Sequence, residues 1–303
     1  MKWFLGVDGG QSSTTAMVGD ENGRVRGTGR GGPCNHAAGE EGRTRLIRAL
    51  RESVGSACAE AGLDAAAVRF EAACLGMSGG SEDKQALVRE LVPAERLRVT
   101  TDAEIALAGA TEAGQGIIVI AGTGSIALGR NAQGRTARAG GWGHLFGDEG
   151  SAYDLVRQAL RAALRMEEGW GPPTGLRAAL LTATESRDAN ELLHRFYAPD
   201  WPRDRIAQLA PRVDEAADAA DPVALEILNS AAMQLALLAA SIRAQLWKPG
   251  ESVAVAYSGG VFRSGRVLER FRLLVEMESG NQCGPVRYSP AEGALREAYR
   301  LRG

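Results

Sequence analysis

The stretch at residues 116–141, GIIVIAGTGSIALGRNAQGRTARAGG, has the same plan as residues 3–31, WFLGVDGGQSSTTAMVGDENGRVRGTGRG. In both, an apolar run enters a glycine-containing turn, a second run leaves it, and a turn with Asn and Gly starts another strand. Each copy then ends in a Gly-Gly exit that carries a histidine, at 31–36 (GGPCNH) and at 140–144 (GGWGH). The match lies in architecture rather than residue identity, and it predicts an internal duplication.

The segments that follow each set of strands also correspond. After the first set, hydrophobic periodicity predicts helices and strands in alternation: helix 40–62, strand 69–75, helix 82–92, strand 96–101 and helix 102–113. After the second set we expect mostly helix and then a similar alternation: helix 149–168, mainly helix over 174–247, strand 252–257, helix 264–278, strand 285–288 and helix 290–300. The sequence therefore predicts a βββαβαβα plan used twice, with a helical insertion in the second copy.

This plan predicts an α/β protein of two lobes around a central cleft, with one glycine turn from each lobe pointing into it. The N-terminal lobe is expected to comprise residues 1–112 plus 290–303, and the C-terminal lobe residues 113–289, with the helical insertion at about 150–247. The apolar stretch 221–247 suits either core or dimer surface, and we expect a homodimer.

Composition limits the possible partners and compartment. The chain has 303 residues and a net charge of -2, so no basic footprint argues for nucleic acid or an anionic membrane. Its four cysteines lie far apart without metal-binding spacing, which favours a reducing compartment. No apolar run approaches membrane-spanning length, and residues 1–7 are too short for a signal segment. These features predict a cytoplasmic protein.

Both glycine turns are candidates for holding phosphate, because glycine lets backbone amides approach an anion closely and hydroxyl groups add donors. Asp8 ends the first apolar run and is suited to hold water on a magnesium ion. A plain β-hairpin explains either turn alone, but two turns at matched places of a repeat favour binding. No GxxxxGK[ST] motif and no GxGxxG opening a helix is present, which excludes Walker and Rossmann sites. The turn residues proposed to bind phosphate are Gly9, Gly10, Gln11, Ser12, Ser13, Thr123 and Gly124.

Asp102 ends the strand RLRVTT and precedes the helix AEIALAGA. It suits a helix N-cap and equally a general base for a hydroxyl group, and the two roles are geometrically compatible.

The two histidine-bearing exits carry the residue types of a carbohydrate site. An aromatic face covers the apolar face of a sugar, while amides and carboxylates pair with its hydroxyl groups. Asp148 and Glu149 are expected to open the following helix, with Glu149 complementing the helix dipole. The candidate sugar-binding side chains are those of Asn35, His36, Trp142, His144 and Asp148.

Residues 257–263, YSGGVFR, leave a strand and enter a helix. Gly259 and Gly260 allow a flat purine to lie against backbone, and Arg263 is able to stack on it, although a tight strand-to-helix connection explains the glycines equally well. Near the C-terminus, Gly293 and Ala294 lie inside a predicted helix, where small side chains permit close helix packing near the lobe interface.

Seven motifs occur in the order expected of a known family. They are DGGQSST, the NH pair at 35–36, TTDAE, AGTGS, GGWGHLFGDEGSAYDL, SGGVFRS and a Pro-x-x-Gly-Ala ending. Over nearly the whole chain this set resembles the BadF/BadG/BcrA/BcrD-type ATPase family, and within it the N-acetylglucosamine kinase branch. The resemblance places the chain in the sugar kinase, heat-shock protein 70 and actin superfamily, with ribonuclease H-like, actin-like ATPase lobes.

The resemblance implies transfer of a phosphoryl group from ATP, with Mg²⁺, to the 6-hydroxyl of an amino sugar. N-Acetylglucosamine is the first candidate, and N-acetylmuramic acid and glucosamine are the others. By the same resemblance Asp102 is the base; Asn35, His36, Trp142, Gly143, His144 and Asp148 line the sugar pocket; Gly259, Gly260 and Arg263 lie near the nucleoside.

Two departures from the family pattern and two alternatives accompany this interpretation. Gly-Gly-Pro-Cys precedes Asn35 where a Ser or Thr is expected, and the zinc-binding cysteine cluster of the repressor/ORF/kinase group is absent. One alternative is an activator ATPase of 2-hydroxyacyl-CoA dehydratases, whose iron-sulfur cluster needs a cysteine pair that the scattered cysteines do not offer. The other is a non-catalytic nucleotide-binding module, against which the two turns together with Asp102 argue.

Overall fold

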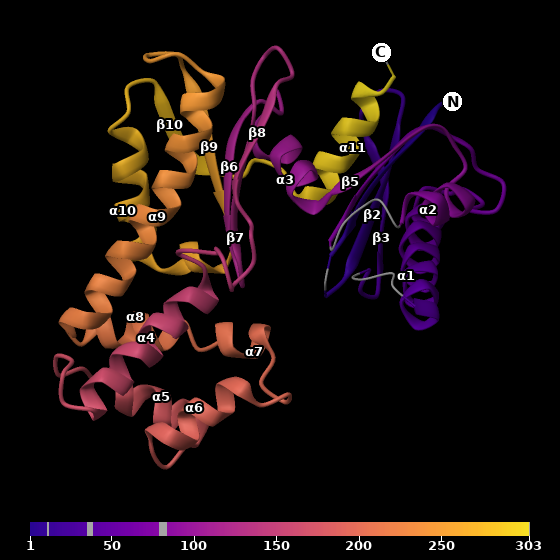
Figure 1. Ribbon diagram of the computed structural model, residues 1–303. Coiled ribbons are helices and arrows are strands. Elements are labelled where there is room, and N and C mark those ends of the chain that lie inside the picture. Colours follow the sequence, from indigo (N-terminus) through magenta and orange to yellow (C-terminus); the bar gives the residue numbers. More distant parts are fainter. Residues whose placement is uncertain (11, 35–38, 79–83, 303) are drawn as a thin grey trace. The chain divides into compact units, whose positions relative to one another are not determined.

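The chain divides into two compact units, which are described separately (Figure 1). In the computed structural model the N-terminal unit comprises residues 1–115 and 286–303, and the C-terminal unit residues 116–285. The structure describes residues 1–10, 12–34, 39–78 and 84–302.

A five-stranded sheet forms the centre of the N-terminal unit, in the order β3-β2-β1-β4-β5. The first three strands are antiparallel to one another, whereas β4 and β5 run parallel to β1. The strands are β1 (Trp3–Gly9), β2 (Thr14–Asp20), β3 (Val25–Gly31), β4 (Phe70–Met77) and β5 (Ala94–Thr101).

Helices cover both faces of this sheet, which explains why β1 is apolar at consecutive positions rather than alternating. Leu5 and Val7 pack with α1 (Gly39–Glu60) on one face, while Phe4 packs on the other face with α3 (Asp102–Ala110) and α11 (Pro290–Arg300). A short helix, α2 (Gln85–Leu91), lies between β4 and β5 in the chain.

The C-terminal unit repeats this topology, because its sheet has the order β8-β7-β6-β9-β10. Here too the first three strands are antiparallel and the last two run parallel to the central strand. The strands are β6 (Gly116–Ala121), β7 (Ser125–Arg130), β8 (Thr136–Gly140), β9 (Val253–Ser258) and β10 (Asn281–Pro285). The predicted duplication is therefore confirmed at the level of strand order and direction.

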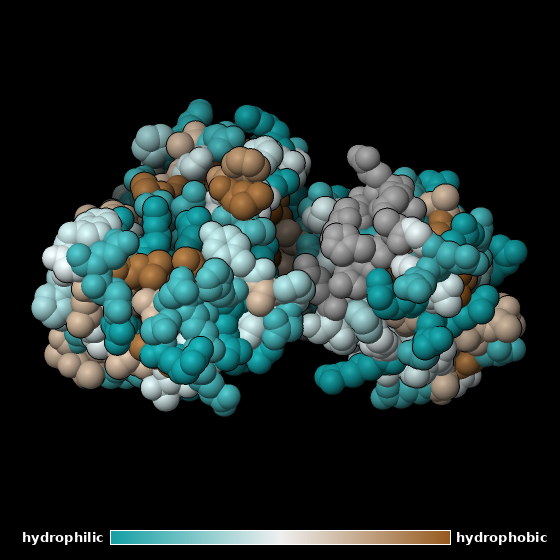
Figure 2. All heavy atoms as spheres, turned by 60° about the horizontal axis from the view of Figure 1, so that its bottom comes forward, coloured by the Kyte–Doolittle hydropathy of each residue, from teal (hydrophilic) through white to brown (hydrophobic). Residues whose placement is uncertain are grey.

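Six helices separate β8 from β9 and form the insertion that the sequence predicts. They are α4 (Ala152–Glu167), α5 (Leu176–Thr184), α6 (Ala189–Tyr197), α7 (Arg203–Ala207), α8 (Pro211–Asp218) and α9 (Pro222–Leu246). A 3₁₀ turn, η1 (Gly260–Arg263), and α10 (Gly265–Glu276) then follow β9. The face of this unit that Figure 2 shows is mainly hydrophilic, with separate apolar patches.

Helix α9 is the one described helix that is long and apolar enough to cross a membrane. Its inner face packs in the core of the C-terminal unit through residues such as Ile227, Leu235 and Ile242, which is the behaviour of a core helix in a folded domain.

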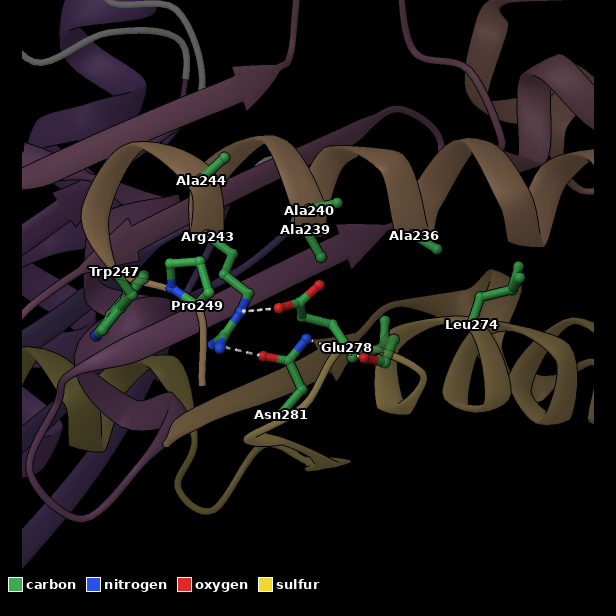
Figure 3. Close-up of a pocket in the computed structure, with 11 residues that line it drawn as sticks. Ala236, Ala239, Ala240, Arg243, Ala244, Trp247, Pro249, Leu274, Glu278 and Asn281 are labelled. Carbon is green, nitrogen blue, oxygen red and sulfur yellow. Dashed lines mark hydrogen bonds and ion pairs between the residues drawn. The ribbon is translucent and has the colours of Figure 1, made fainter. Parts of the chain in front are cut away.

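Arg243 on α9 shows how the helix is fixed to the end of β10 (Figure 3). The side chain is buried beside a cavity of about 310 Å³, and its Nη1 donates to Asn281 Oδ1 at 2.9 Å. Its Nη2 donates to the carbonyl oxygens of Glu251 and Ser279 at 2.9 Å each, and Glu278 lies 3.5 Å from Nε. Because these groups satisfy the buried charge, the cavity is a structural feature rather than a candidate site.

One predicted strand is misplaced. The last strand of the C-terminal unit spans Asn281–Pro285 and not 285–288. Its sequence, NQCGP, lacks an apolar or β-branched run, and it forms a strand because it pairs in parallel with β9. Tertiary pairing overrides local propensity at this edge of the sheet.

Gly293 provides a test of the packing in the N-terminal unit. A Cβ at this position of α11 would lie 2.1 Å from the carbonyl oxygen of Ile105 and 2.7 Å from the amide nitrogen of Gly109. Because both contacts are with backbone, we expect Gly293→Ala to lower the free energy of unfolding by about 2 kcal/mol or more. Gly55 in α1 is the matched control: a Cβ there meets open space, so Gly55→Ala should stabilise the helix by about 0.5–1 kcal/mol. Urea unfolding measures both, and equal effects would contradict the assigned packing.

Candidate functional site

The first glycine turn joins β1 to β2. It is closed by a hydrogen bond from the Gly10 amide to the Ser13 carbonyl at 3.0 Å. In the described part of the chain the amides of Ser12 and Ser13 have no acceptor, and both residues are exposed. They are therefore free to donate to an anion. Gln11 of this turn, and Asn35 and His36 of the first exit, lie outside the described residues.

The second glycine turn joins β6 to β7 in the same way. The Gly122 amide donates to the Gly124 carbonyl at 2.9 Å, and the Gly122 carbonyl accepts from the amide of Ala152, the first residue of α4. The amides of Thr123 and Gly124 have no acceptor among the residues that the structure describes. In its described residues, each unit thus presents two backbone donors without an acceptor at the same place of the repeat.

Asp102 is the first residue of α3 and not its N-cap, which was one of the two roles that the sequence left open for it. Thr101 is the N-cap, because its Oγ1 accepts from the Glu104 amide at 3.3 Å. One carboxylate oxygen of Asp102 accepts from the Ala103 amide at 2.8 Å, and the other accepts from Ser78 Oγ at 2.6 Å. The residue is nevertheless exposed, so it is a fixed carboxylate open to a substrate.

Ser78 is a site residue that the sequence analysis missed. It follows β4, and its amide donates to the Gly9 carbonyl at 3.0 Å. The carbonyl oxygen of Ser78 accepts a hydrogen bond from the ammonium of the fully buried Lys84. The sequence did contain a sign of it: Ser-Gly-Gly stands at 78–80, directly after β4, and again at 258–260, where the corresponding strand β9 ends at Ser258. Ser78 therefore links the first glycine turn to Asp102.

Asp8 lies on β1 close enough to Asp102 for the two charges to interact. Burial and, to a smaller extent, the negative charge of Asp102 together raise the pKa of Asp8 from its ordinary 3.8 to about 6. Two neighbouring carboxylates with unrelieved negative charge are suited to a divalent cation that keeps several waters. Since no cluster of three or more His, Cys, Asp or Glu occurs within the described ranges, they fit Mg²⁺ better than a closed metal cage.

The loop after β8 exposes an aromatic side chain. Trp142 is 71% exposed, and the guanidinium of Arg138 lies 5.2 Å from its ring centroid. Gly143, with φ of 80°, closes a turn by accepting from the Gly147 amide at 2.8 Å. The ring of His144 packs edge-on against Tyr153, 5.2 Å between centroids. The loop offers an aromatic face and an imidazole on one unit.

Asp148 and Glu149 do not open helix α4, contrary to expectation. The helix begins at Ala152, and Ser151 is its N-cap, accepting from the Asp154 amide at 3.2 Å. Asp148 adopts the left-handed conformation with φ of 63° and is only 4% exposed. Its carboxylate accepts from the Ser125 amide at 3.2 Å and forms an ion pair with Arg203. Glu149 is exposed, and its carbonyl accepts from Ser125 Oγ at 2.7 Å, so it has no first-turn role.

Gly259 connects β9 to the 3₁₀ turn beside the second glycine turn. Its φ is 110°, and a Cβ there would lie 2.2 Å from the carbonyl oxygen of Ala121, the residue before Gly122. A Cβ at Gly260 would meet open space, and Arg263 is exposed. The C-terminal unit therefore gathers Gly259 and the Gly122–Ser125 turn at one end of its sheet, with backbone open to a flat ligand.

Arg203 is the other residue that the sequence did not single out. It is the first residue of α7, and its Nη2 donates to the Thr123 carbonyl at 3.1 Å as well as to Asp148. No sequence motif identifies Arg203, because its partners Thr123 and Asp148 lie 80 and 55 positions away in the chain.

The chain is similar to proteins of one family along almost its whole length. The BadF/BadG/BcrA/BcrD ATPase family profile matches residues 5–298. An N-acetylmuramic acid/N-acetylglucosamine kinase of Clostridium acetobutylicum is 34% identical over 285 residues, which cover 91% of each chain. An N-acetyl-D-glucosamine kinase of Dictyostelium discoideum is 32% identical over 280 residues, covering 85% of this chain and 84% of its own.

Solved structures agree with these relatives. A candidate N-acetylglucosamine kinase from Chromobacterium violaceum superposes with a TM-score of 0.76 at 26% identity, covering 97% of this chain and 98% of the other. A glucokinase of the ROK family from Streptomyces griseus, solved with glucose and AMPPNP, has a TM-score of 0.56 at 22% identity and 98% coverage of both chains. The second likeness extends to the fold alone, an actin-like ATPase fold.

Replacing Asp8 by Asn tests the electrostatics of this site. Because the pKa of Asp8 is raised to about 6 in the folded protein, its protonated form stabilises the fold, and this stabilisation is lost as the pH rises from about 4 through 6. The amide side chain that Asp8→Asn introduces cannot ionise. The melting temperature of the variant minus that of the wild type should therefore increase from pH 4 to pH 7.5. Asp200→Asn, the same change at an exposed position, is the control and should show no such trend. A constant difference between Asp8→Asn and wild type across this range would contradict the raised pKa.

Proposed function

Because the chain belongs to the BadF/BadG/BcrA/BcrD ATPase family, we propose that it is a kinase that transfers a phosphoryl group from ATP to the 6-hydroxyl of an amino sugar. N-Acetylglucosamine is the proposed substrate, and N-acetylmuramic acid and glucosamine are the other members of the class. The observation that carries this proposal is Asp102, a carboxylate held by two hydrogen bonds yet open to solvent beside a turn with free amides.

Asp102 acts as the general base that accepts the proton of the sugar hydroxyl. Ser78 Oγ and the Ala103 amide hold its two oxygens, which fixes the direction from which a hydroxyl approaches. When bound, ATP supplies the phosphoryl group and Mg²⁺ neutralises part of its charge. Phosphoryl transfer asks the protein mainly for positioning and charge neutralisation, so a rigidly held base suits the reaction.

Each turn has backbone amides, without an acceptor in the described chain, that would donate to phosphate oxygens. In the C-terminal unit these donors are Thr123 and Gly124, and in the N-terminal unit Ser12 and Ser13. Gly9 and Gly10 keep the first turn compact, since a Cβ at Gly9 would lie 2.5 Å from Met77 Sδ. Asp8 holds the metal through water. Gln11 is proposed to complete the phosphate-binding turn.

The sugar and the nucleoside are assigned to loops that the structure describes in part. The exposed face of Trp142 supports stacking on an amino sugar, and His144 lies two residues further along the same loop. The open backbone at Gly259 and Gly260, next to exposed Arg263, supports a place for the purine. The remaining residues of the proposed sugar pocket are Asn35, His36 and Gly143, whereas Asp148, which the resemblance also assigns to it, is buried and paired with Arg203 against the second glycine turn.

Asp102→Asn tests the mechanism. Removing the base should lower kcat for sugar-dependent ADP release by about 10²–10⁴-fold, with little change in the KM for ATP. Ser78→Ala, which keeps the base but removes one of its hydrogen bonds, should have a smaller effect. Asp64→Asn at an exposed position is the control. If ADP release were independent of sugar, or if 6-deoxy-N-acetylglucosamine were consumed as fast as N-acetylglucosamine, the proposed reaction would be wrong.

We also propose that the protein acts in the cytoplasm as a homodimer. Supporting the dimer, α9 and α10 pack together and expose apolar side chains at Met233, Leu237, Leu273 and Met277. Large uncovered apolar side chains on adjacent helices suit a protein interface. Sedimentation equilibrium should give a dimer for the wild type and a monomer for Leu237→Glu. A monomeric wild type would contradict the proposal.

A further inference from the structure

The helical insertion delivers one positive charge to the second glycine turn. Arg203 starts α7, and its guanidinium reaches the turn, where Nη2 donates to the Thr123 carbonyl at 3.1 Å and pairs with Asp148. The ion pair lies directly against the backbone of the turn. A Cβ at Gly124 would be 2.7 Å from Arg203 Nη2 and 2.8 Å from Asp148 Oδ2. A side chain at this position would therefore displace the ion pair.

Asp148 is costly to place here without a partner. It is 4% exposed and has a left-handed backbone, and its Oδ1 accepts from the amide of Ser125. An unpaired buried carboxylate destabilises a fold by several kcal/mol. Next to a phosphate-binding turn it has a second effect, because its charge would repel the phosphate groups that the Thr123 and Gly124 amides bind.

The contacts of Arg203 indicate that its charge matters more than its hydrogen bonds. Its Nε is buried and has no acceptor in the described chain, which costs about 1–3 kcal/mol. The guanidinium also lies 5.7 Å from the centroid of the Tyr153 ring on α4. A side chain that leaves a buried donor unsatisfied while it reaches a carboxylate 55 residues away in sequence marks a functional constraint.

We infer that Arg203 is a positioning residue of the nucleotide-binding turn: it cancels the charge of Asp148 and fixes both Asp148 and Thr123, so that the turn accepts phosphate. The inference rests on the proposed function, since it takes this turn to hold the phosphates of ATP. It also gives part of the helical insertion a role in the nucleotide site of its own unit.

Nucleotide binding tests the inference without relying on catalysis. Titration calorimetry with AMPPNP and Mg²⁺ should show that Arg203→Met weakens the Kd at least about tenfold, because an uncompensated charge then faces the phosphates. Asp148→Asn should bind as tightly as the wild type or more tightly, since it leaves a positive charge near the phosphates. The double variant Arg203→Met/Asp148→Asn removes both charges and should return to within about threefold of the wild type.

Two further variants separate this role from a merely structural one. Arg203→Lys keeps the charge and should retain most of the nucleotide affinity. Arg205→Met lies on the same helix, where Arg205 is exposed and stacks 4.2 Å from the Trp201 ring centroid, and it should bind like the wild type. If Arg203→Met and Asp148→Asn weakened binding equally, or if the double variant were no better than Arg203→Met, the inference would be overturned.

The same experiment distinguishes failure of the inference from failure of the proposed function. A wild type that binds AMPPNP but phosphorylates no amino sugar would remove the proposed reaction and leave the role of Arg203 intact. If Arg203→Met does not fold, Arg203→Lys and Asp148→Asn still decide the matter, because weaker nucleotide binding by both would contradict the role of charge.

Discussion

Backbone amides without an acceptor are the feature on which the rest of the site depends. In each unit a sharp turn closes on itself through one hydrogen bond, and two neighbouring amides, at Ser12 and Ser13 and again at Thr123 and Gly124, have no acceptor among the described residues. Backbone donors left in this way are tolerated where water or a ligand completes them. Such paired donors fit an anion. The charged side chains around each turn determine the net charge next to that anion.

The two units adjust that charge in different ways. In the N-terminal unit, Asp8 and Asp102 are two neighbouring carboxylates, and the pKa of Asp8 is raised first by its burial and then by the charge of Asp102. That arrangement suits a cation together with a base. In the C-terminal unit, the carboxylate of Asp148 is neutralised by Arg203, which suits direct contact between backbone and phosphate. The same turn therefore lies beside two carboxylates in one unit and beside a carboxylate paired with an arginine in the other.

Much of the fold follows from the sequence, because its signals are local and repeated. The apolar runs that flank each turn predict the antiparallel strands, and the alternation that follows predicts the parallel ones. The strand at Asn281–Pro285 is not predicted by the sequence, because it forms through pairing with β9 and its own residues show no strand pattern. The sequence identifies Asp102 as a strand-end carboxylate, but the N-cap is Thr101, because the two residues are adjacent and both types suit a helix start.

The site was less predictable where it depends on contacts between distant segments. Asp148 resembles a helix-start residue in sequence, and only its buried pairing with Arg203 explains its left-handed conformation. Arg203 lies among many arginines of similar context, so no local pattern separates it from Arg205. Long-range ion pairs of this kind leave no periodic trace in a single sequence.

The Ser-Gly-Gly motif after β4 and β9 shows how a repeated local structure acquires two functions. After β4, Ser78 donates to Asp102 and its amide bonds to Gly9, so this copy orients a carboxylate beside the first turn. After β9, Gly259 packs against Ala121, so this copy brings open backbone to the second turn. In both cases the motif belongs to the strand next to the central one, β4 beside β1 and β9 beside β6. Because the Ser-Gly-Gly letters are the same in both copies, the difference between them comes from the groups that each copy contacts, Asp102 in one and Ala121 in the other.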